Sequence, residues 1–345
     1  MKYRLYTTSY KAWDGMFKAI SKAEKSVYLE MYILANDTKR THNFFSLLKE
    51  KAAKGLEVVI IADSYGSSEL EDSFINELRK SGAEFKFFSH WLKRTHRKIL
   101  IVDNKVAFLG GVNIKESSRN WRDLHIKIEG APVKLLIKSF AKAYRLCGGK
   151  RQSLIQYRFT VLPRKIKNWI FDNWRSTSKL YSLSSYYKKK ISHAKFLLQI
   201  VTPYLLPPRW LLVAIDDACQ RGVKVEMIIP SDTDIKFLNK MNYINAYRLS
   251  RVGVKFYMGK EMNHAKIMVI DKEEVVIGSQ NIDLLSFKVN YEAGIFSRQK
   301  DLVQDVLKII EKWKKEAKEY KKWPKKIKIV NKIFLYFLKI FYPIF

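Results

Sequence analysis

The chain carries one pattern of reactive residues twice: His96, Lys98, Asp103 and Asn113 in the first copy, and His264, Lys266, Asp271 and Asn281 in the second. In both copies the asparagine follows the histidine by 17 residues and lies just after a glycine-containing turn. An imidazole can act as a nucleophile or move a proton, while lysine and asparagine side chains can hold an anion. The duplication predicts one active site built from two halves.

The elements that must position these side chains are two apolar runs. Residues 98–103 and 266–271 are nearly continuous runs of Ile, Leu, Val and Met, as is typical of strands buried on both faces. Successive side chains of a strand alternate between its two faces, so a histidine and a lysine two residues apart lie on the same side. Each pair is therefore predicted to converge on one ligand.

The repetition extends beyond the motifs. In the first half, residues 27–33 are predicted to form a strand, a helix runs to residues 54–55, and residues 56–63 form the next strand. The second half repeats this order with a strand over 196–204, a helix ending near 220–222 and a strand over 223–230. Both halves are therefore expected to be α/β.

Length and composition indicate two ordinary domains and no disulfide framework. A chain of 345 residues with 47% hydrophobic residues can bury a sizeable core. Its two cysteines, Cys147 and Cys219, lie far apart without metal-ligand spacing, which suits a reducing compartment. No secretory signal is visible over residues 1–25, so we expect the protein to stay inside the cell.

The positive charge is concentrated in two segments. The formal net charge is +32; residues 161–190 hold eight Lys/Arg against Asp172, and residues 308–345 hold twelve Lys against three Glu. Such segments indicate a polyanionic partner, and on charge alone nucleic acid and an anionic membrane are both candidates.

The C-terminal segment 311–345 is expected to be a basic amphipathic helix that associates with a membrane. On a helix Lys325, Lys328, Lys332 and Lys339 form one stripe, and aromatic and aliphatic residues cover much of the remaining surface. A last helix packed on the core, with its lysines facing water, is the alternative. The run is too interrupted by lysines to predict a membrane-spanning helix.

The segment 158–190 interleaves aromatic residues such as Trp169 and Trp174 with Lys and Arg. This composition suits contact with lipid headgroups or stacking on single-stranded nucleic acid, and it also suits an ordinary amphipathic linker. We interpret it as a linker between the halves that contacts a membrane.

With its paired H-x-K-x4-D motifs the chain resembles the phospholipase D superfamily, and more narrowly the bacterial cardiolipin synthases. The narrower likeness rests on residues 121–130 and on Asn290-Tyr291-Glu292, which sit where that family's motif extensions fall. It covers roughly residues 3 to 310. The resemblance implies two α/β domains related by a pseudo-twofold axis, over 1–157 and 191–310. Each is a mixed sheet flanked by helices, with the active site at their interface.

The resemblance also implies roles for the site residues. His96 would be the nucleophile that forms a phosphohistidine, and His264 the general acid and then the general base, although the near symmetry allows the reverse. Lys98, Lys266, Asn113 and Asn281 would hold the nonbridging oxygens. Asp123 and Glu292 match the family positions whose carboxylates orient a histidine.

The remaining motif positions have lesser expected roles. Ser279 can add a hydroxyl to the phosphate, whereas Gly111 at the equivalent place cannot. Asp103 and Asp271 are expected to be structural acids at the ends of strands. The arrangement requires neither a metal nor another cofactor.

The expected function is phosphatidyl transfer on the cytoplasmic face of the membrane, condensing two phosphatidylglycerols to cardiolipin and glycerol. A phospholipase D or a transphosphatidylase using another alcohol is the first alternative, and a nuclease of the superfamily is the second. A membrane-binding module without activity is a third. No arginine follows Asn281 within residues 282–286, where the synthases usually have one, which bears on substrate identity and not on the core chemistry.

Overall fold

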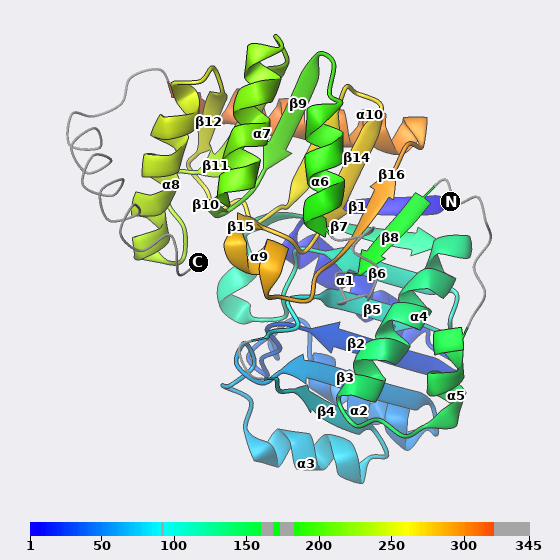
Figure 1. Cartoon of the computed structure of the whole chain (residues 1–345). Helices are drawn as coiled ribbons and strands as arrows, with labels where there is room; N and C mark the ends of the chain where they lie inside the picture. The colour runs from blue at the N-terminus through cyan, green and yellow to red at the C-terminus, as the bar shows by residue number, and fades with distance from the viewer. Residues whose placement is uncertain (91–92, 160–167, 173–182, 321–345) are drawn as a thin grey trace.

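The two apolar runs that follow the histidines become central strands of two separate sheets. The structure is a computed structural model that describes residues 1–90, 93–159, 168–172 and 183–320. It contains two α/β domains packed against each other, each a mixed sheet with helices on both faces (Figure 1). The predicted fold class is confirmed.

The sheet of the first domain has seven strands in the order β1-β7-β6-β5-β2-β3-β4. Their bounds are β1 (Lys2–Thr8), β2 (Ser26–Met31), β3 (Glu57–Asp63), β4 (Glu84–Phe88), β5 (Lys98–Val102), β6 (Val106–Gly110) and β7 (Arg122–Glu129). Strands β2, β3 and β4 are parallel, and β5 runs antiparallel to β2. Every residue of β2 and β5 is buried, as the apolar runs predict.

The sheet of the second domain repeats this plan in the order β17-β12-β11-β9-β13-β14-β16-β8. Its strands are β8 (Asn168–Asp172), β9 (Leu197–Val201), β11 (Lys224–Pro230), β12 (Lys255–Gly259), β13 (Ile267–Ile270), β14 (Glu274–Gly278), β16 (Ala293–Ser297) and β17 (Lys318–Glu319). Strand β13 runs antiparallel to β9, as β5 does to β2. The short strands β10 (Leu205–Leu206) and β15 (Ile282–Asp283) pair separately.

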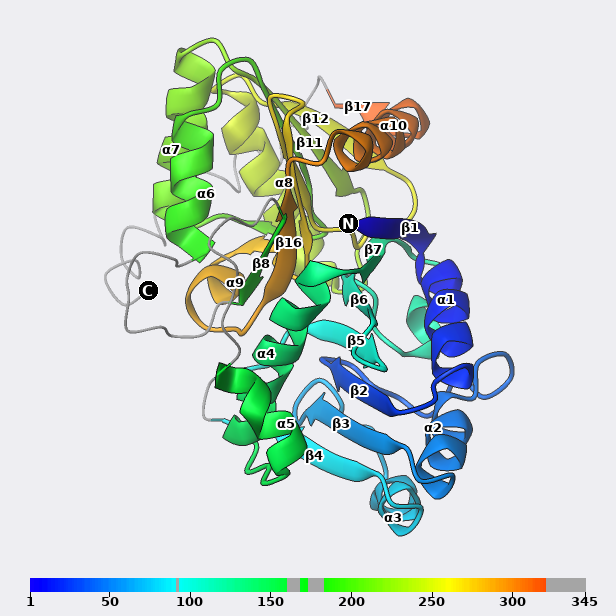
Figure 2. The same ribbon diagram turned by 90° about the vertical axis from the view of Figure 1, so that its right-hand side faces the viewer.

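Helices cover both faces of each sheet (Figure 2). In the first domain they are α1 (Ser9–Ser21), α2 (Phe44–Ala53), α3 (Asp72–Lys80), α4 (Ala131–Leu146) and α5 (Gln152–Ile155). In the second they are α6 (Leu183–Ser192), α7 (Arg209–Gln220), α8 (Lys236–Ser250), α9 (Leu284–Lys288) and α10 (Lys300–Glu316). Two short 3-10 turns lie at Glu116–Ser118 and Gln156–Phe159.

One hydrophobic core spans the boundary between the domains. Buried residues of β5, β6 and β7 form a single cluster with those of β13, β14 and β16, and α4 and α10 contribute to the same cluster. Separate clusters lie between the first sheet and α1 to α3, and between the second sheet and α6 to α8. The shared core holds the two domains in one arrangement and so positions the site between them.

Two expectations about domain limits need correction. Within the expected linker 158–190, residues 168–172 form β8 at the edge of the second sheet, and Leu183 and Tyr187 of α6 are buried in the second domain. Residues 311–316 complete α10, where Trp313 is buried in the shared core. Residues 160–167, 173–182 and 321–345, which include the lysine stripe of the tail, lie outside the described residues.

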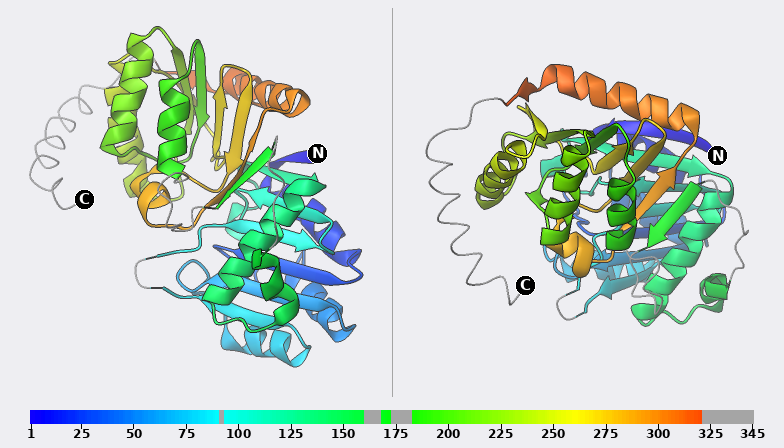
Figure 3. Two further views of the ribbon diagram at one scale, coloured as in Figure 1. Left: turned by 45° about the vertical axis from the view of Figure 1, so that its right-hand side comes forward. Right: turned by 45° about the horizontal axis from the view of Figure 1, so that its top comes forward.

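Figure 3 shows α10 lying along the second domain, near the strand β1 at which the chain begins. Tyr3 of β1 donates a hydrogen bond to Asp305 of α10 at 2.8 Å, so the two ends of the described chain are joined. Within the described residues, the helices are too short or too polar to cross a bilayer.

Candidate active site

Each H-x-K motif is anchored at the far end of its strand by an aspartate. Asp103 accepts hydrogen bonds from the backbone N–H groups of Glu24, Lys25 and Ser26 at 2.8–3.2 Å. Asp271 accepts the matching bonds from Lys195, Phe196 and Leu197 at 2.9–3.0 Å. Both aspartates have a positive φ, near 50°, in a tight turn that Asp tolerates well. They tie the hairpin to the preceding strand and do not bond to the histidines.

The opposite ends of the motifs meet across the domain interface. The backbone N–H of His96 donates to Tyr291 O at 2.9 Å, and the N–H of His264 donates to Arg122 O at 2.7 Å. Isolated bridges join Thr95 with Tyr291 and Arg122 with Asn263. Each histidine is therefore held by backbone of the other domain, next to that domain's carboxylate.

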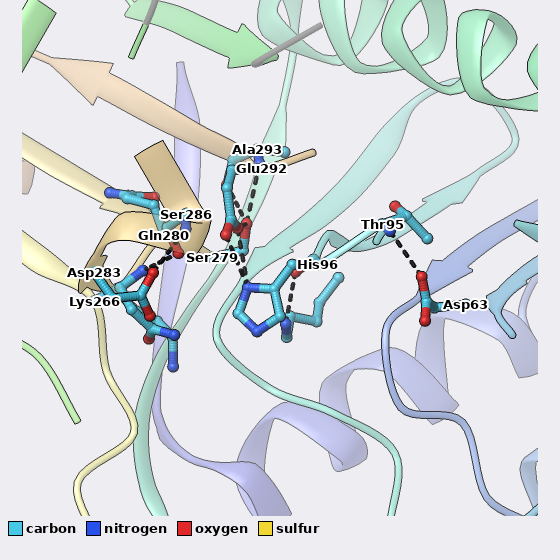
Figure 4. A network of polar contacts seen from close by, with 12 residues as sticks. Asp63, Thr95, His96, Lys266, Ser279, Gln280, Asp283, Ser286, Glu292 and Ala293 are labelled. Carbon is cyan, nitrogen blue, oxygen red and sulfur yellow. Dashed lines mark hydrogen bonds and ion pairs between the residues drawn. The ribbon is translucent and has the colours of Figure 1, made fainter. Parts of the chain in front are cut away.

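Each histidine is bound to a carboxylate from the opposite domain. Glu292, beside β16, places both carboxylate oxygens 3.0 Å from His96 Nδ1 (Figure 4). Asp123 of β7 places Oδ2 2.9 Å from His264 Nδ1. The structure thus unites all four of these predicted residues, but the carboxylate that follows each histidine in sequence serves the other histidine.

These hydrogen bonds decide which nitrogen of each ring faces a substrate. Burial acts to raise the pKa of both carboxyl groups, but their interactions with the histidines outweigh it and hold each pKa below its ordinary value. An ionised carboxylate only accepts, so the Nδ1 atom of each ring must be the donor. In the neutral rings the Nε2 lone pair is therefore available for attack.

Burial also keeps both imidazoles neutral in the free protein. The His96 side chain is 9% exposed and that of His264 is 5% exposed. Burial lowers the pKa of His264 to about 3 and lowers the pKa of His96, while the carboxylates act in the opposite direction. A neutral ring suits the nucleophile. A general acid needs a second proton, which the negative charge of a bound phosphate favours.

Ser279 and Gly111 occupy equivalent positions beside the two carboxylates. The Ser279 hydroxyl donates to Glu292 Oε2 at 2.5 Å and accepts from Ala293 N at 3.0 Å. A Cβ at Gly111 would lie 2.2 Å from Asp123 Oδ1, so a side chain there would displace this carboxylate. The Ser279 hydroxyl already serves the Glu292–His96 pair, and its expected contact with phosphate stays a prediction.

The two lysines are buried cations in the same site. Lys98 Nζ donates to His96 O at 2.6 Å and Lys266 Nζ donates to His264 O at 2.5 Å, which leaves further N–H donors on each ammonium. Burial lowers the pKa of Lys98 well below its ordinary value and that of Lys266 to about 8, and the charge of Lys266 lowers the pKa of Lys98 further. An anion placed between them would relieve this repulsion.

Both asparagines are buried as well. Asn113 Oδ1 accepts from Ile33 N at 3.3 Å, and its backbone carbonyl accepts from the Trp13 indole at 2.8 Å. The Asn281 N–H donates to the Ser286 hydroxyl at 3.0 Å, while Asn281 Oδ1 has no hydrogen-bond partner among the described residues. Their amides remain available to hold a ligand.

Aromatic side chains around the histidines were not predicted from the sequence. The Tyr32 ring lies 4.7 Å from that of His96, and Lys98 Nζ lies 4.9 Å from the same Tyr32 ring. Trp121 and Tyr204 lie 5.4 and 6.3 Å from the His264 ring. Trp121 precedes Asp123 by two residues, and that proximity was the one available signal for it. Tyr32 and Tyr204 follow strands without a distinguishing pattern.

Asp63 is a second residue that the sequence analysis missed. Its carboxylate accepts from Thr95 N at 2.8 Å, immediately before His96, and from the N–H groups of Tyr65 and Gly66 (Figure 4). Its place at the end of strand β3 was the usable signal, since ligand sites in α/β sheets gather at the carboxyl ends of strands. Asp63 fixes the backbone from which the His96 side chain extends.

Two imidazoles, two buried ammonium groups and two amides around one point can bind a tetrahedral oxyanion. Sulfate, which is fully ionised above pH 4, tests this without chemistry. We expect sulfate affinity to fall as pH rises above about 8, where Lys266 loses its proton. Each proton that must be bound for sulfate to bind lowers the affinity by about tenfold per pH unit at most. Bound sulfate raises the pKa of Lys266, so deprotonation above the free-state value opposes binding. Titration calorimetry between pH 7 and pH 10 measures this slope.

Lys266→Arg is the matched control for the sulfate titration, because arginine keeps its charge over this whole range. Between pH 8 and 10 we expect the sulfate affinity of the variant to fall less steeply with pH, because the proton on Lys266 no longer contributes to the slope. A slope identical to that of the unaltered protein would remove Lys266 from the anion site.

Two α/β domains that each contribute an H-x-K motif and a crossed carboxylate to one site define a phospholipase D-like protein. The family model described as "Cardiolipin synthase, PLD-like domain" matches residues 16–144 and 187–314, one match for each domain. The chain belongs to this family.

Named relatives agree with this assignment, and a solved structure shares the fold. The chain is 33% identical over 315 residues to a cardiolipin synthase of Clostridium perfringens, covering 85% of this chain and 66% of that protein, slightly under two thirds of its length. It is 29% identical over 323 residues to the minor cardiolipin synthase ClsB of Bacillus subtilis, covering 88% and 79%. The crystal structure of phosphatidylserine synthase from Haemophilus influenzae superposes with a TM-score of 0.74 at 15% identity over 98% and 93% of the two chains, a likeness of fold.

Proposed function

We propose that this protein is a phosphatidyltransferase of the cardiolipin synthase type, which condenses two phosphatidylglycerols to cardiolipin and glycerol. The observation that carries the proposal is the pair of crossed histidine–carboxylate contacts around two buried lysines. Phosphoryl transfer through a covalent intermediate needs a nucleophile, an acid and a site for the phosphate charge. This site supplies all three, and the named relatives support the substrate class.

In the first step His96 Nε2 attacks the phosphorus of one phosphatidylglycerol. A nitrogen–phosphorus bond forms as the bond from phosphorus to the glycerol headgroup oxygen breaks. His264, protonated in the presence of the bound anion, gives its Nε2 proton to the departing oxygen. Glycerol leaves and a phosphatidyl group remains on His96. The Glu292 contact holds the His96 ring and stabilises the positive charge that develops on it.

In the second step a headgroup hydroxyl of another phosphatidylglycerol attacks the same phosphorus. His264, now neutral, accepts the hydroxyl proton as the new oxygen–phosphorus bond forms and the bond to His96 breaks. Cardiolipin leaves and both rings return to their starting state. Water arriving in place of the lipid would give phosphatidic acid, so transfer requires that the mouth of the site exclude water.

The lysines and asparagines act on the charge of the phosphate throughout both steps. Lys98 and Lys266 are preorganised by their bonds to backbone carbonyls, so little reorganisation is needed when negative charge develops. Asn113 and Asn281 complete the ring of donors with their side-chain amides. This places the nonbridging oxygens between the two domains.

A lipid substrate implies a membrane partner, and we propose that the protein acts peripherally on an anionic bilayer at the cytoplasmic face of the cell membrane. The formal net charge of +32 supports this location, because each basic residue near an anionic surface contributes to binding. The basic segments 161–190 and 308–345 would add to that attraction.

Purified protein incubated with phosphatidylglycerol in detergent micelles tests the proposed function, with lipid products separated by chromatography and identified by mass spectrometry. We expect cardiolipin and glycerol in equal amounts. Phosphatidic acid without cardiolipin would identify a phospholipase instead. Absence of any lipid product, combined with cleavage of single-stranded DNA, would identify a nuclease. Contaminating activity is excluded by repeating the assay with His96→Ala.

A further inference from the structure

Large apolar side chains are exposed on segments that contact the residues around the two histidines. Eight large hydrophobic residues are classed as exposed within the described parts of the chain, and four of them belong to one region. These are Tyr65, Ile235, Phe237 and Leu285, with 65%, 47%, 66% and 56% of their surface accessible. We call these four residues the apolar rim.

Two rim residues follow a carboxylate that is linked to His264. The Tyr204 hydroxyl donates to Asp234 Oδ1 at 2.5 Å, and the Tyr204 ring contacts the His264 ring. Ile235 is the next residue after Asp234, and Phe237 lies in the first turn of α8. The start of α8 therefore borders the His264 side of the site.

Leu285 borders the site from α9. It follows Asp283 by two residues, and Asp283 caps α9 by accepting from Ser286 N at 2.7 Å. Burial raises the pKa of Asp283, and His96 acts against that rise. Burial lowers the pKa of Lys266, and the charge of Asp283 acts against that fall. The short α9 thus presents Leu285 to solvent two residues from a carboxylate whose charge acts on Lys266.

Tyr65 belongs to the other domain and completes the rim. The Arg94 guanidinium lies 4.8 Å from the centre of the Tyr65 ring. Both residues act on the pKa of Tyr32, whose ring contacts His96. Figure 1 shows the arrowheads of β2 and β3 directed toward the side of the molecule where α8 and α9 lie. The rim therefore draws on both domains and on segments linked to both histidines.

Basic residues are interspersed with the rim. Lys236 and Lys240 of α8 and Lys288 of α9 are exposed, and Arg94 lies against Tyr65. The acids nearby are Asp232, Asp234 and Asp283, which accept hydrogen bonds from Asn239, Tyr204 and Ser286. Apolar side chains surrounded by cations match the interface of an anionic bilayer, where acyl chains lie beneath negatively charged headgroups.

We propose that the apolar rim inserts into the headgroup–acyl boundary of an anionic membrane and seats the catalytic opening on the lipid surface. The proposal rests on the proposed function, because two lipids anchored in one leaflet must reach the site from one side. A seated rim also excludes bulk water from the phosphatidyl-enzyme. The rim thereby favours a lipid hydroxyl over water as the acceptor.

The test compares Phe237→Asp/Leu285→Asp with the matched control Phe196→Asp/Leu146→Asp. Phe196 and Leu146 are 49% and 46% exposed and lie outside the rim. Sedimentation with vesicles of equal parts phosphatidylglycerol and phosphatidylcholine measures binding. We expect the rim variant to bind about tenfold more weakly or worse, because it replaces inserted apolar groups by charge. The control should stay within about twofold, as exposed substitutions do.

Turnover of a short-chain, fully dissolved phosphatidylglycerol separates this proposal from the proposed function. We expect the rim variant to keep its activity on the dissolved lipid while losing activity on vesicles. Failure of the unaltered protein to act on either lipid would overturn the proposed function. Vesicle sedimentation would still test whether the apolar rim binds the membrane. Equal vesicle binding by the rim and control variants would overturn the membrane proposal. A changed oligomeric state with unaltered vesicle binding would also overturn it and assign the rim to a second copy.

A second measurement changes only one rim residue and introduces no charge there, which matters if the aspartate variants fold poorly. Leu285→Cys, in a background with Cys147 and Cys219 replaced by alanine, carries an environment-sensitive fluorophore. We expect a blue shift of its emission on addition of the same vesicles and none with pure phosphatidylcholine vesicles. Emission that does not change with anionic vesicles would contradict insertion.

Discussion

His96→Ala and His264→Ala are each expected to lower the rate of phosphatidyl transfer by about 10³-fold or more without unfolding the protein. Loss of His96 removes the atom that forms the covalent intermediate, and loss of His264 removes the proton donor for a poor alkoxide leaving group. The shared core of the two domains does not depend on either ring, so the fold should persist. Initial rates with phosphatidylglycerol measure the loss, and circular dichroism checks the fold.

His193→Ala is the matched control for the two histidine substitutions. His193-Ala194-Lys195 repeats the tripeptide of the second motif, but His193 is exposed and contacts its own helix through Lys189 O at 2.8 Å. We expect full activity for this variant. Activity within about tenfold of normal in either motif variant would contradict the mechanism, because acid–base catalysis by a single group contributes about 10²-fold at least.

Rapid quenching under alkaline conditions, which preserve phosphohistidine, decides which ring becomes phosphorylated. We expect the phosphatidyl group on the peptide that contains His96. Because the two carboxylate contacts are nearly symmetric, detection on the His264 peptide would reverse the roles of the two rings. The remainder of the mechanism would then be retained.

Glu30→Val is expected to lower the free energy of unfolding by about 3–5 kcal/mol, because it leaves a buried guanidinium without its carboxylate. Arg97 Nη2 lies 2.9 Å from Glu30 Oε2, and both side chains are 0% exposed. Thr95 Oγ1 donates to Glu30 Oε1 at 2.5 Å, which links this pair to the backbone before His96. Urea denaturation followed by circular dichroism measures the change.

The second domain provides a natural comparison for the Glu30–Arg97 pair. Glu30 pairs with Ile99 across β2 and β5, and Val201 pairs with Ile267 across β9 and β13. The equivalents of Glu30 and Arg97 are therefore Val201 and Ala265, so the second domain has no ion pair at this place.

The double variant Glu30→Val/Arg97→Met tests whether the cost is one of unpaired charge. Replacement of a buried ion pair by apolar groups of similar volume is often nearly neutral. We expect the double variant to recover most of the stability lost in Glu30→Val, though not all, because the Thr95 hydroxyl loses its acceptor. A double variant as unstable as the single one would show that packing, and not charge, dominates here.

The strands of the site were predictable because their signals are local. Continuous apolar runs mark β5 and β13, and alternation along a strand places His96 beside Lys98. Asp103 and Asp271 form hydrogen bonds to the start of a neighbouring strand, as residues at strand ends commonly do. Repetition of the whole pattern indicated a site made from two halves.

Other features depended on contacts between residues distant in the chain. Asp123 and Glu292 were recognisable as acids that orient a histidine, but their exchange between domains follows from the way the two sheets pack. The hydrogen bond from the Ser279 hydroxyl to Glu292 was likewise not apparent from the sequence, because the two residues meet only in the folded chain. The sequence analysis separated segment 158–190 from the second domain, because its many basic residues indicated a linker and not the strand β8.

The amino-acid sequence was sufficient for the chemistry of each half-site and for the α/β class, since side-chain type, spacing and strand periodicity are properties of short segments. The pairing of each imidazole with a carboxylate of the other domain, the neutral state of both rings and the apolar rim required the folded chain. Burial, electrostatic coupling and exposure depend on which distant segments meet, and that is set by the core shared between the two domains.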